Sequence, residues 1–323
     1  MKVVITGANG FVGRALLHRL VNGAAFGGMS AALLPTGPIE PIAVVRSPAA
    51  AEALRTTFPT LHIVVSGIKD VVLAEHLAGA HAVVHLAWST VPVVADADPG
   101  GDLEANLAHG LQFLESCGRA HIGRFVFVSS GGTLYGSSGT VPHTERTVPD
   151  PRGAYGTGKH CFELYMNVRA KQLGFEALAL RVANLYGKTG TGRKEQGVVE
   201  QWMDRIWTGS PLEVWNGLDV VRDYVFIDDM IDVLLAAVER PIKEPLLNVG
   251  TGIGTSLGEL RAHMARIIGR DAVVQLRGDQ PPSISWNVLD PSLLQRTWGL
   301  APRTTLDAGL NKLWAERQLR QRA

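Results

Sequence analysis

The sequence predicts an α/β fold built on a doubly wound parallel sheet, with a smaller mixed α/β region towards its C-terminal end. Short apolar runs rich in Val and Ile alternate with longer segments of helical spacing through the first half of the chain. Apolar runs without polar alternation indicate strands buried on both faces, which is typical of parallel sheets covered by helices. A glycine-rich turn directly after the first run supports the same fold class.

The elements are expected in a regular order. Residues 3–5 form the first strand, and residues 12–21 form the first helix, because their leucines have helical spacing. Further strands are expected at 42–45, 61–65, 82–86, 125–128 and 177–181. Residues 23–41 are rich in Gly, Ala and Pro, and we expect them to form a loop inserted between the first helix and the second strand.

The regular alternation ends near Asn184, and tryptophans become frequent beyond it. We therefore expect a large domain of residues 1–184, joined by about 218–250. A smaller domain is expected from residues 185–217 and 251–323, partly interleaved with the first.

The composition excludes several classes of protein. Of 323 residues, 46% are hydrophobic, which is typical of a globular chain with a large core. Lys and Arg (31) balance Asp and Glu (30), so no basic surface for nucleic acid or anionic membranes is expected. The apolar runs are too short to span a bilayer, and the two cysteines form no disulfide framework. We therefore expect a cytoplasmic protein. We also expect no metal site, because the histidines lack the spacing of metal ligands.

Residues 6–13 read Thr-Gly-Ala-Asn-Gly-Phe-Val-Gly, between the first strand and the first helix. In this context glycines permit a tight turn, close approach of a pyrophosphate, and packing of helix on sheet. The helix N-terminus then offers free N–H groups and a partial positive charge. The motif predicts a dinucleotide-binding turn, whose candidate residues are Gly7, Asn9, Gly10, Phe11, Val12 and Gly13.

The end of the second strand bears on the choice between NAD and NADP. A carboxylate there binds the ribose 2′-OH of NAD, whereas an arginine accommodates the 2′-phosphate of NADP. Arg46 occupies this place and no acid stands beside it. It favours NADP, although a solvated surface arginine explains the same residue equally well.

Tyr155 and Lys159 have the spacing that places two side chains on one face of a helix. A tyrosine hydroxyl is a weak base at neutral pH, and a nearby ammonium favours its phenolate. A strand end rich in hydroxyl groups precedes the pair. Ser130 or Thr133 could hydrogen-bond the reacting oxygen and pass on its proton. The four residues together predict a catalytic site for oxidation or reduction of a carbinol or carbonyl.

These motifs together resemble the extended short-chain dehydrogenase/reductase family, and within it the nucleotide-sugar epimerases and dehydratases of the UDP-glucose 4-epimerase type. The resemblance covers nearly the whole chain. It rests on residues 6–13, 85–87, Asn106, Tyr155, Lys159, 181–187, 221–229, 250–252 and 287–290. It implies a Rossmann-type cofactor domain, a C-terminal substrate domain and a homodimer.

The resemblance also implies roles for individual residues. Leu86, Ala87 and Trp88 would contact the cofactor, and Lys159 would also hold the nicotinamide ribose. Asn184 and Arg222 would bind the diphosphate of a nucleotide sugar, with Trp215 near the base. In the implied reaction the tyrosine takes a proton from a sugar hydroxyl as hydride leaves. The keto-sugar then turns over and takes the hydride back on its other face.

Some positions depart from the family pattern and keep other functions open. Gly131 stands where the family has its catalytic serine or threonine, and Gln280 and Ser283 stand where it has residues that grip the nucleotide. An NADP-dependent reductase or dehydrogenase of a smaller carbonyl or hydroxy substrate is therefore the alternative to an epimerase. A non-enzymatic dinucleotide-binding regulator is a further alternative, which the presence of both Tyr155 and Lys159 opposes.

Overall fold

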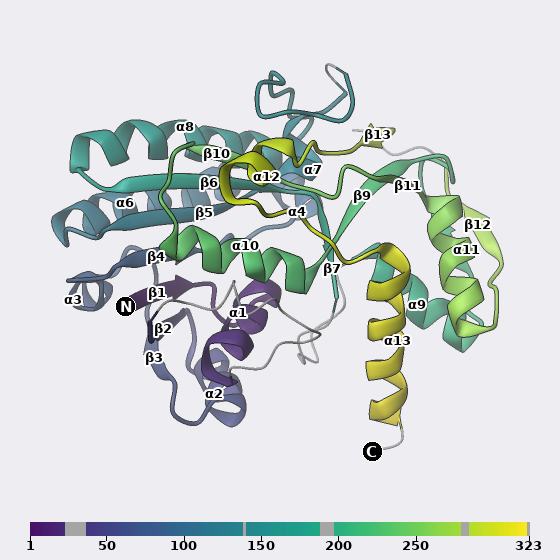
Figure 1. Ribbon diagram of the computed structural model, residues 1–323, viewed down its shortest axis with the longest axis horizontal. Coiled ribbons are helices and arrows are strands. Elements are labelled where there is room, and N and C mark those ends of the chain that lie inside the picture. The colour runs from purple at the N-terminus through teal and green to yellow at the C-terminus, as the bar shows by residue number, and fades with distance from the viewer. Residues whose placement is uncertain (23–36, 138–139, 188–196, 279–283, 322–323) are drawn as a thin grey trace.

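The computed structural model describes residues 1–22, 37–137, 140–187, 197–278 and 284–321. Its centre is a seven-stranded, all-parallel sheet in the order β10-β6-β5-β4-β1-β2-β3 (Figure 1). The strands are β1 (Lys2–Thr6), β2 (Glu40–Val45), β3 (His62–Val65), β4 (Ala82–His85), β5 (Arg124–Ser130), β6 (Glu176–Val182) and β10 (Leu246–Val249). This architecture confirms the predicted doubly wound α/β fold.

The chain changes direction across the sheet at β1. Strands β2 and β3 extend the sheet on one side of β1, and β4 pairs with the other side. In open α/β sheets, ligands bind where such a reversal occurs, which here is at the carboxyl ends of β1 and β4.

Two helical layers cover the sheet because its side chains alternate between two faces. Val3 and Ile5 pack with α1 (Phe11–Asn22), α2 (Pro48–Thr57) and α10 (Ile227–Glu239) in one core. Val4, Phe125 and Phe127 pack with the second layer in another core. That layer consists of α3 (Val71–Leu77), α6 (His109–Arg119) and α8 (Ala154–Leu173).

Short elements surround the carboxyl end of β4 and β5. They are α4 (Pro92–Ala97), α5 (Pro99–Asp102), a π-helical turn η2 (Leu103–Ala108) that leads into α6, and α7 (Gly131–Leu134). The remaining strands form two small sheets: β7 (Asn184–Tyr186), β9 (Val221–Phe226), β11 (Gly254–Ser256) and β13 (Trp286–Asn287) in one, and β8 (Leu212–Val214) with β12 (Val274–Leu276) in the other. Helices α9 (Val198–Thr208), α11 (Leu257–Ile268), α12 (Ser292–Trp298) and α13 (Leu306–Gln321) complete the described chain.

The six predicted strands and the first helix are confirmed to within two residues at each end. The inserted loop was drawn too long, because Glu40 and Pro41 pair with Lys2 and Val3 and so belong to β2. Its residues 23–36 lie outside the described chain. Within the segment 218–250, β10 joins the large sheet whereas β9 pairs in a small sheet. The domain limits themselves stay a prediction.

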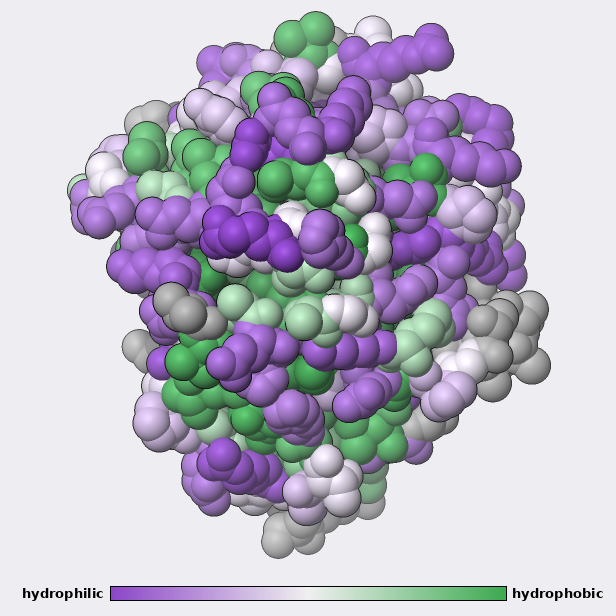
Figure 2. Space-filling model, turned by 90° about the vertical axis from the view of Figure 1, so that its left-hand side faces the viewer, coloured by the Kyte–Doolittle hydropathy of each residue, from purple (hydrophilic) through white to green (hydrophobic). Residues whose placement is uncertain are grey.

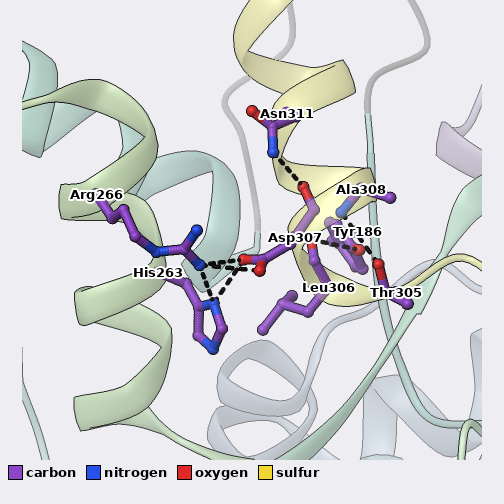
Figure 3. A network of polar contacts seen from close by, with 8 residues as sticks. All are labelled: Tyr186, His263, Arg266, Thr305, Leu306, Asp307, Ala308 and Asn311. Carbon is purple, nitrogen blue, oxygen red and sulfur yellow. Dashed lines mark hydrogen bonds and ion pairs between the residues drawn. The ribbon is translucent and has the colours of Figure 1, made fainter.

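The C-terminal helix α13 is held against α11 by a polar network (Figure 3). The Asp307 carboxylate accepts hydrogen bonds from Arg266 Nη2 at 2.7 Å and, at 2.6 Å, from His263 Nδ1. These contacts are partly exposed, so they orient the helix more than they stabilise the fold. The buried side chains of Leu310, Leu313 and Trp314 provide the apolar contact.

Polar side chains cover most of the face that lies at the left of Figure 1, with apolar ones in small patches among them (Figure 2). In the part of the chain that the structure describes, no helix is both long and apolar enough to cross a membrane.

Candidate active site

The glycine-rich turn crosses directly over the end of β4. Gly7 has a φ of +67°, and a Cβ on it would lie 2.8 Å from the backbone nitrogen of Ala87. A Cβ on Gly13 would lie 2.6 Å from the carbonyl oxygens of Gly7 and Ala8. No side chain fits at either position, so both glycines are required for the β1–α1 turn to pack against the sheet.

The turn suits a dinucleotide diphosphate. Phe11 begins α1, so the first N–H groups of that helix point to the crevice at the end of β1. A Cβ on Gly10 would meet no described atom other than the Gly7 oxygen at 3.1 Å, which leaves this side of the turn open to a ligand. The Asn9 side chain instead accepts a hydrogen bond from Arg14 Nε at 2.9 Å, so its contribution is to the shape of the turn.

The carboxyl edge of β2 and β3 lacks a free acid among its described residues. Arg46 follows β2 and is exposed to solvent, and the side chain of Ser47 caps α2 by accepting a hydrogen bond from Ala50 N. The nearby Asp70 carboxylate accepts a hydrogen bond from Gly67 N at 2.6 Å. A 2′-phosphate would therefore meet a guanidinium here rather than a carboxylate.

Tyr155 and Lys159 both lie on α8, near its N-terminal end. Asp96 of α4 fixes this end by accepting a hydrogen bond from Ala154 N at 2.7 Å. Tyr155 is thus in the first turn of the helix, where the helix dipole favours a negative charge on its oxygen. The predicted pair is brought together, with Lys159 Nζ 5.3 Å from the centre of the Tyr155 ring.

Lys159 is almost completely buried. Its Nζ donates a hydrogen bond to the Val128 oxygen at 2.7 Å and lies over the rings of Trp88 (4.9 Å) and Phe127 (5.1 Å). Burial lowers the pKa of Lys159 to about 7, against the opposing charges of Glu163 and Asp102. Burial also raises the pKa of Tyr155. In the free protein Lys159 is therefore close to its titration midpoint at neutral pH, and Tyr155 is protonated. A bound cationic cofactor would favour the phenolate form of Tyr155.

Two hydroxyl groups meet at the end of β5. Thr133 Oγ1 donates a hydrogen bond to Ser130 Oγ at 3.0 Å. Gly131, between them, has no room for a side chain, because a Cβ would collide with the buried Leu289. A hydroxyl-bearing side chain at the family's usual place would require Leu289 to move, and the Ser130–Thr133 pair is the nearest replacement.

A cavity of about 450 Å³ lies among β7, β9, the end of β8 and the helices α9 and α11. Asn184 and Arg222 line it, as does Trp215, which is 42% exposed at its rim. Burial lowers the pKa of Arg222, whose Nη1 donates a hydrogen bond to the adjacent Val221 oxygen at 2.8 Å and to no other described residue. A partly buried guanidinium with further donors is suited to a diphosphate.

The sequence prediction missed other residues at this cavity. Glu213 lines it and accepts a hydrogen bond from Arg277 Nη2 at 2.6 Å. Tyr224 also lines it, and its hydroxyl is buried without a hydrogen-bond partner in the described chain. Tyr224 could have been predicted, because residues two apart in a strand point to the same face and Tyr224 follows Arg222 by two in β9. Gln280 and Ser283 lie outside the described residues.

Trp88 and its neighbours lie between the cofactor turn and the catalytic pair. Ala87 N donates to Thr6 Oγ1 at 3.4 Å, and Leu86 N donates to the Thr6 oxygen at 3.3 Å. The Trp88 ring meets the Tyr155 ring edge-on at 6.2 Å, and its Nε1 has no hydrogen-bond partner among the described residues.

Comparisons with known proteins agree with this geometry. The chain is 26% identical over 313 residues to a UDP-glucose 4-epimerase of Mycolicibacterium smegmatis, covering 97% of each chain. It is 27% identical over 231 residues to a dTDP-4-dehydro-6-deoxyglucose reductase of Escherichia coli, covering 72% of this chain and 73% of that one. Among solved structures, a UDP-glucose 4-epimerase from Thermotoga maritima with UDP-glucose matches with a TM-score of 0.86 and 26% identity. That match covers 99% of this chain and 100% of the other.

The NAD complex of a Thermus thermophilus UDP-glucose 4-epimerase matches with a TM-score of 0.83 and 25% identity, over 98% and 99% of the two chains. The model of the NAD dependent epimerase/dehydratase family matches residues 3–250, which include the glycine turn, the Tyr155–Lys159 pair and Arg222. The chain therefore belongs to the NAD-dependent epimerase/dehydratase family of enzymes.

Proposed function

We propose that this enzyme is a nucleotide-sugar epimerase of the UDP-glucose 4-epimerase type that works through a transient keto-sugar. One observation carries the proposal. Asn184 lines the cavity beside Arg222, and its Oδ1 is 3.0 Å from where a Cβ on Gly132 would lie, next to the Ser130–Thr133 pair. A diphosphate held by Arg222 and Asn184 would therefore place the attached sugar towards Tyr155.

In the proposed reaction Tyr155 is the acid and base. As phenolate it accepts the proton of a sugar hydroxyl, and it returns the proton once the keto-sugar has presented its other face. Lys159 and the N-terminal end of α8 stabilise the phenolate. The nicotinamide cofactor, when bound, supplies the chemistry that removes and returns hydride. The Ser130–Thr133 pair would hydrogen-bond the reacting oxygen in place of a hydroxyl at Gly131.

The cofactor would lie across the carboxyl ends of β1 and β4. Its diphosphate would rest on Gly10 and the first turn of α1, and Lys159 would hold the nicotinamide ribose. We propose that NAD is the cofactor of an epimerase built on this fold, as in the NAD complex of the Thermus thermophilus relative. The exposed Arg46 is the one feature at this edge that favours NADP.

The first experiment is to denature the purified protein and identify the released ligand by mass spectrometry and absorbance. Stoichiometric NAD, together with interconversion of UDP-glucose and UDP-galactose without added cofactor, is the expected result. Tyr155→Phe should then retain NAD and lose turnover, because it removes only the hydroxyl. Near-normal turnover by this variant would refute the proposed chemistry.

An NADP-dependent reductase is the second candidate, and Arg46 is the observation that favours it. This enzyme would be isolated without cofactor, would bind NADPH in preference to NADH, and would reduce a carbonyl substrate. Arg46→Ala should then weaken NADPH binding and leave NADH binding unchanged. A protein that retains NAD through purification would rule this candidate out.

We also retain the proposal of a homodimer. The outer face of α8 exposes the apolar side chains of Leu164 (55%), Tyr165 (49%) and Val168 (54%). An apolar stripe on a long surface helix is well suited to pairing with its own copy. Light scattering after size exclusion should show a dimer, and Val168→Glu should shift it to a monomer. A wild-type monomer would refute the proposal.

A further inference from the structure

Asp102 is a buried carboxylate next to the helix turn that carries Tyr155 and Lys159. The proposed reaction does not use it. Asp102 ends α5 and is 3% exposed. Its Oδ1 accepts a hydrogen bond from Asn106 Nδ2 at 2.8 Å and another from the Thr90 hydroxyl. Its other oxygen faces α8, because a Cβ on Gly158 would lie 3.0 Å from Asp102 Oδ2. Gly158 directly precedes Lys159, so the free oxygen is aimed at the catalytic turn.

Among the described residues Asp102 forms no ion pair, and Lys159 is a cation on which its charge acts. Its hydrogen-bond partners in the described chain, Thr90 and Asn106, are both neutral. Glu163, the other carboxylate near Lys159, is engaged differently, because it forms a buried ion pair with Arg181 at 2.6 Å. Glu163 raises the pKa of Lys159 more than Asp102 does, but its charge is shared with Arg181, whereas that of Asp102 is not shared with a described cation in an ion pair.

The backbone next to Asp102 has an unusual conformation that fixes the orientation of its carboxylate. Asp102 directly precedes the π-helical turn η2, and Asn106 lies within that turn. The Asn106 side chain links Asp102 to the segment after β4, because its Oδ1 also accepts a hydrogen bond from Ser89 N at 2.7 Å. π-Helical turns are rare and frequently occur at functional sites. Here the turn aligns Asn106 so that it holds the carboxylate in one orientation.

We propose that Asp102 is a positioning residue of the catalytic pair, whose buried negative charge keeps the Lys159 ammonium protonated. The proposal deepens the function proposed above by naming a residue that acts through Lys159 without touching the substrate. The titratable groups that face Lys159 are His85 of β4, Tyr155 and Glu163 of α8, and Asp102; Arg181 of β6 pairs with Glu163. Burial lowers the pKa of His85 to about 3, so this neighbour is neutral at physiological pH.

The requirement arises from burial. A lysine that has lost its hydration tends to lose its proton, and burial lowers the pKa of Lys159 to about 7 even with both carboxylates nearby. A neutral amine would give the Tyr155 phenolate no electrostatic support. Asp102 also raises the pKa of Tyr155. Removal of its charge should therefore lower both pKa values together, which is a distinctive signature.

The test is an NMR titration of Lys159 in protein labelled with 13C at lysine Cε, with the resonance assigned by Lys159→Arg. Asp102→Asn keeps an oxygen that can accept from Thr90 and Asn106, so the fold should be preserved. Its Lys159 proton affinity should fall by about tenfold, one pKa unit. Asp102→Glu should restore the wild-type midpoint. The matched control is Asp96→Asn. Asp96 belongs to α4 and contacts the N-terminal end of α8, so this variant also removes a nearby carboxylate but should leave the Lys159 midpoint unchanged.

An unchanged or raised Lys159 midpoint in folded Asp102→Asn protein would overturn the proposal, as would a fall of equal size in Asp96→Asn. Should Asp102→Asn not fold, Asp102→Ala provides the second test. It removes the same charge, so the midpoint should fall, and a midpoint that does not fall would overturn the proposal. The titration needs no substrate, so its outcome is independent of whether the protein is an epimerase. With UDP-glucose turnover as a second readout, both limbs of the pH profile should move to lower pH in Asp102→Asn.

Discussion

Asp228, in the first turn of α10, provides a sharp test of how burial acts on charge in this fold. Its side chain is 14% exposed, and its Oδ2 is 3.9 Å from Lys312 Nζ of α13, beyond hydrogen-bond distance. That oxygen has no hydrogen-bond partner among the described residues. Burial raises the pKa of Asp228 to about 7, with the charges of Lys312 and Arg19 opposing the rise. An ionised Asp228 should therefore destabilise the native protein.

The sign and size follow from linkage. An unfolded aspartate titrates near 3.9. Between that pH and about 7 the native state holds a proton that the unfolded state has lost, so stability falls as pH rises through this window. Three pKa units correspond to about 4 kcal/mol at pH 8. Asp228→Asn removes this loss but retains an amide whose burial costs about 2 kcal/mol. The expected net gain is about 2 kcal/mol at pH 8 and about zero at pH 5.

Urea denaturation at these two pH values measures the effect through the free energy of unfolding. The matched control is Asp219→Asn, because Asp219 is exposed and its charge is solvated. The reasoning is wrong if Asp228→Asn is no more stable than the wild type at pH 8. It is equally wrong if the gain has the same size at pH 5 as at pH 8.

Other predictions concern the site itself. Glu163→Gln should cost about 3–5 kcal/mol in urea denaturation, since it leaves the Arg181 guanidinium buried without its partner; a loss below about 1 kcal/mol would contradict this. Gly131→Ala should cost about 1–3 kcal/mol through collision with Leu289, and Leu289→Val should recover part of it; strictly additive effects in the double variant would argue against the contact. Arg222→Ala should weaken UDP-glucose binding by about tenfold or more, measured by calorimetry, and leave NAD binding unchanged; equal losses of both would remove Arg222 from the diphosphate site.

The large sheet was readable from the sequence because its strands are buried on both faces. A strand such as β4 is buried along its whole length and begins with three consecutive apolar side chains, Ala82, Val83 and Val84, and this pattern is visible without a structure. Strand β10 was missed although it joins the same sheet. It follows a long gap in the pattern and includes Asn248, which is buried because Tyr135 and His143 satisfy its side chain. Such a pairing is invisible in a linear sequence.

The candidate site divides in the same way. Tyr155 and Lys159 were found because one helix fixes their relation, and the glycine turn because its neighbours in sequence are its neighbours in space. Asp102 and Glu213 were not found, because their role depends on elements far away along the chain. Nothing near Asp102 in the sequence indicates that its free oxygen faces Gly158.

The sequence by itself determined the class of fold, the position of the glycine-rich turn and the helix that carries Tyr155 and Lys159. Each of these depends on local spacing, and local spacing is set by the periodicity of helices and strands. Only the tertiary structure decided the protonation states of Tyr155 and Lys159. The pKa of Lys159 depends on how completely the rings of Trp88 and Phe127 exclude water, and on the carboxylates they enclose. Solvent exclusion is a property of the packed molecule, because it requires side chains from several distant segments to close around one group.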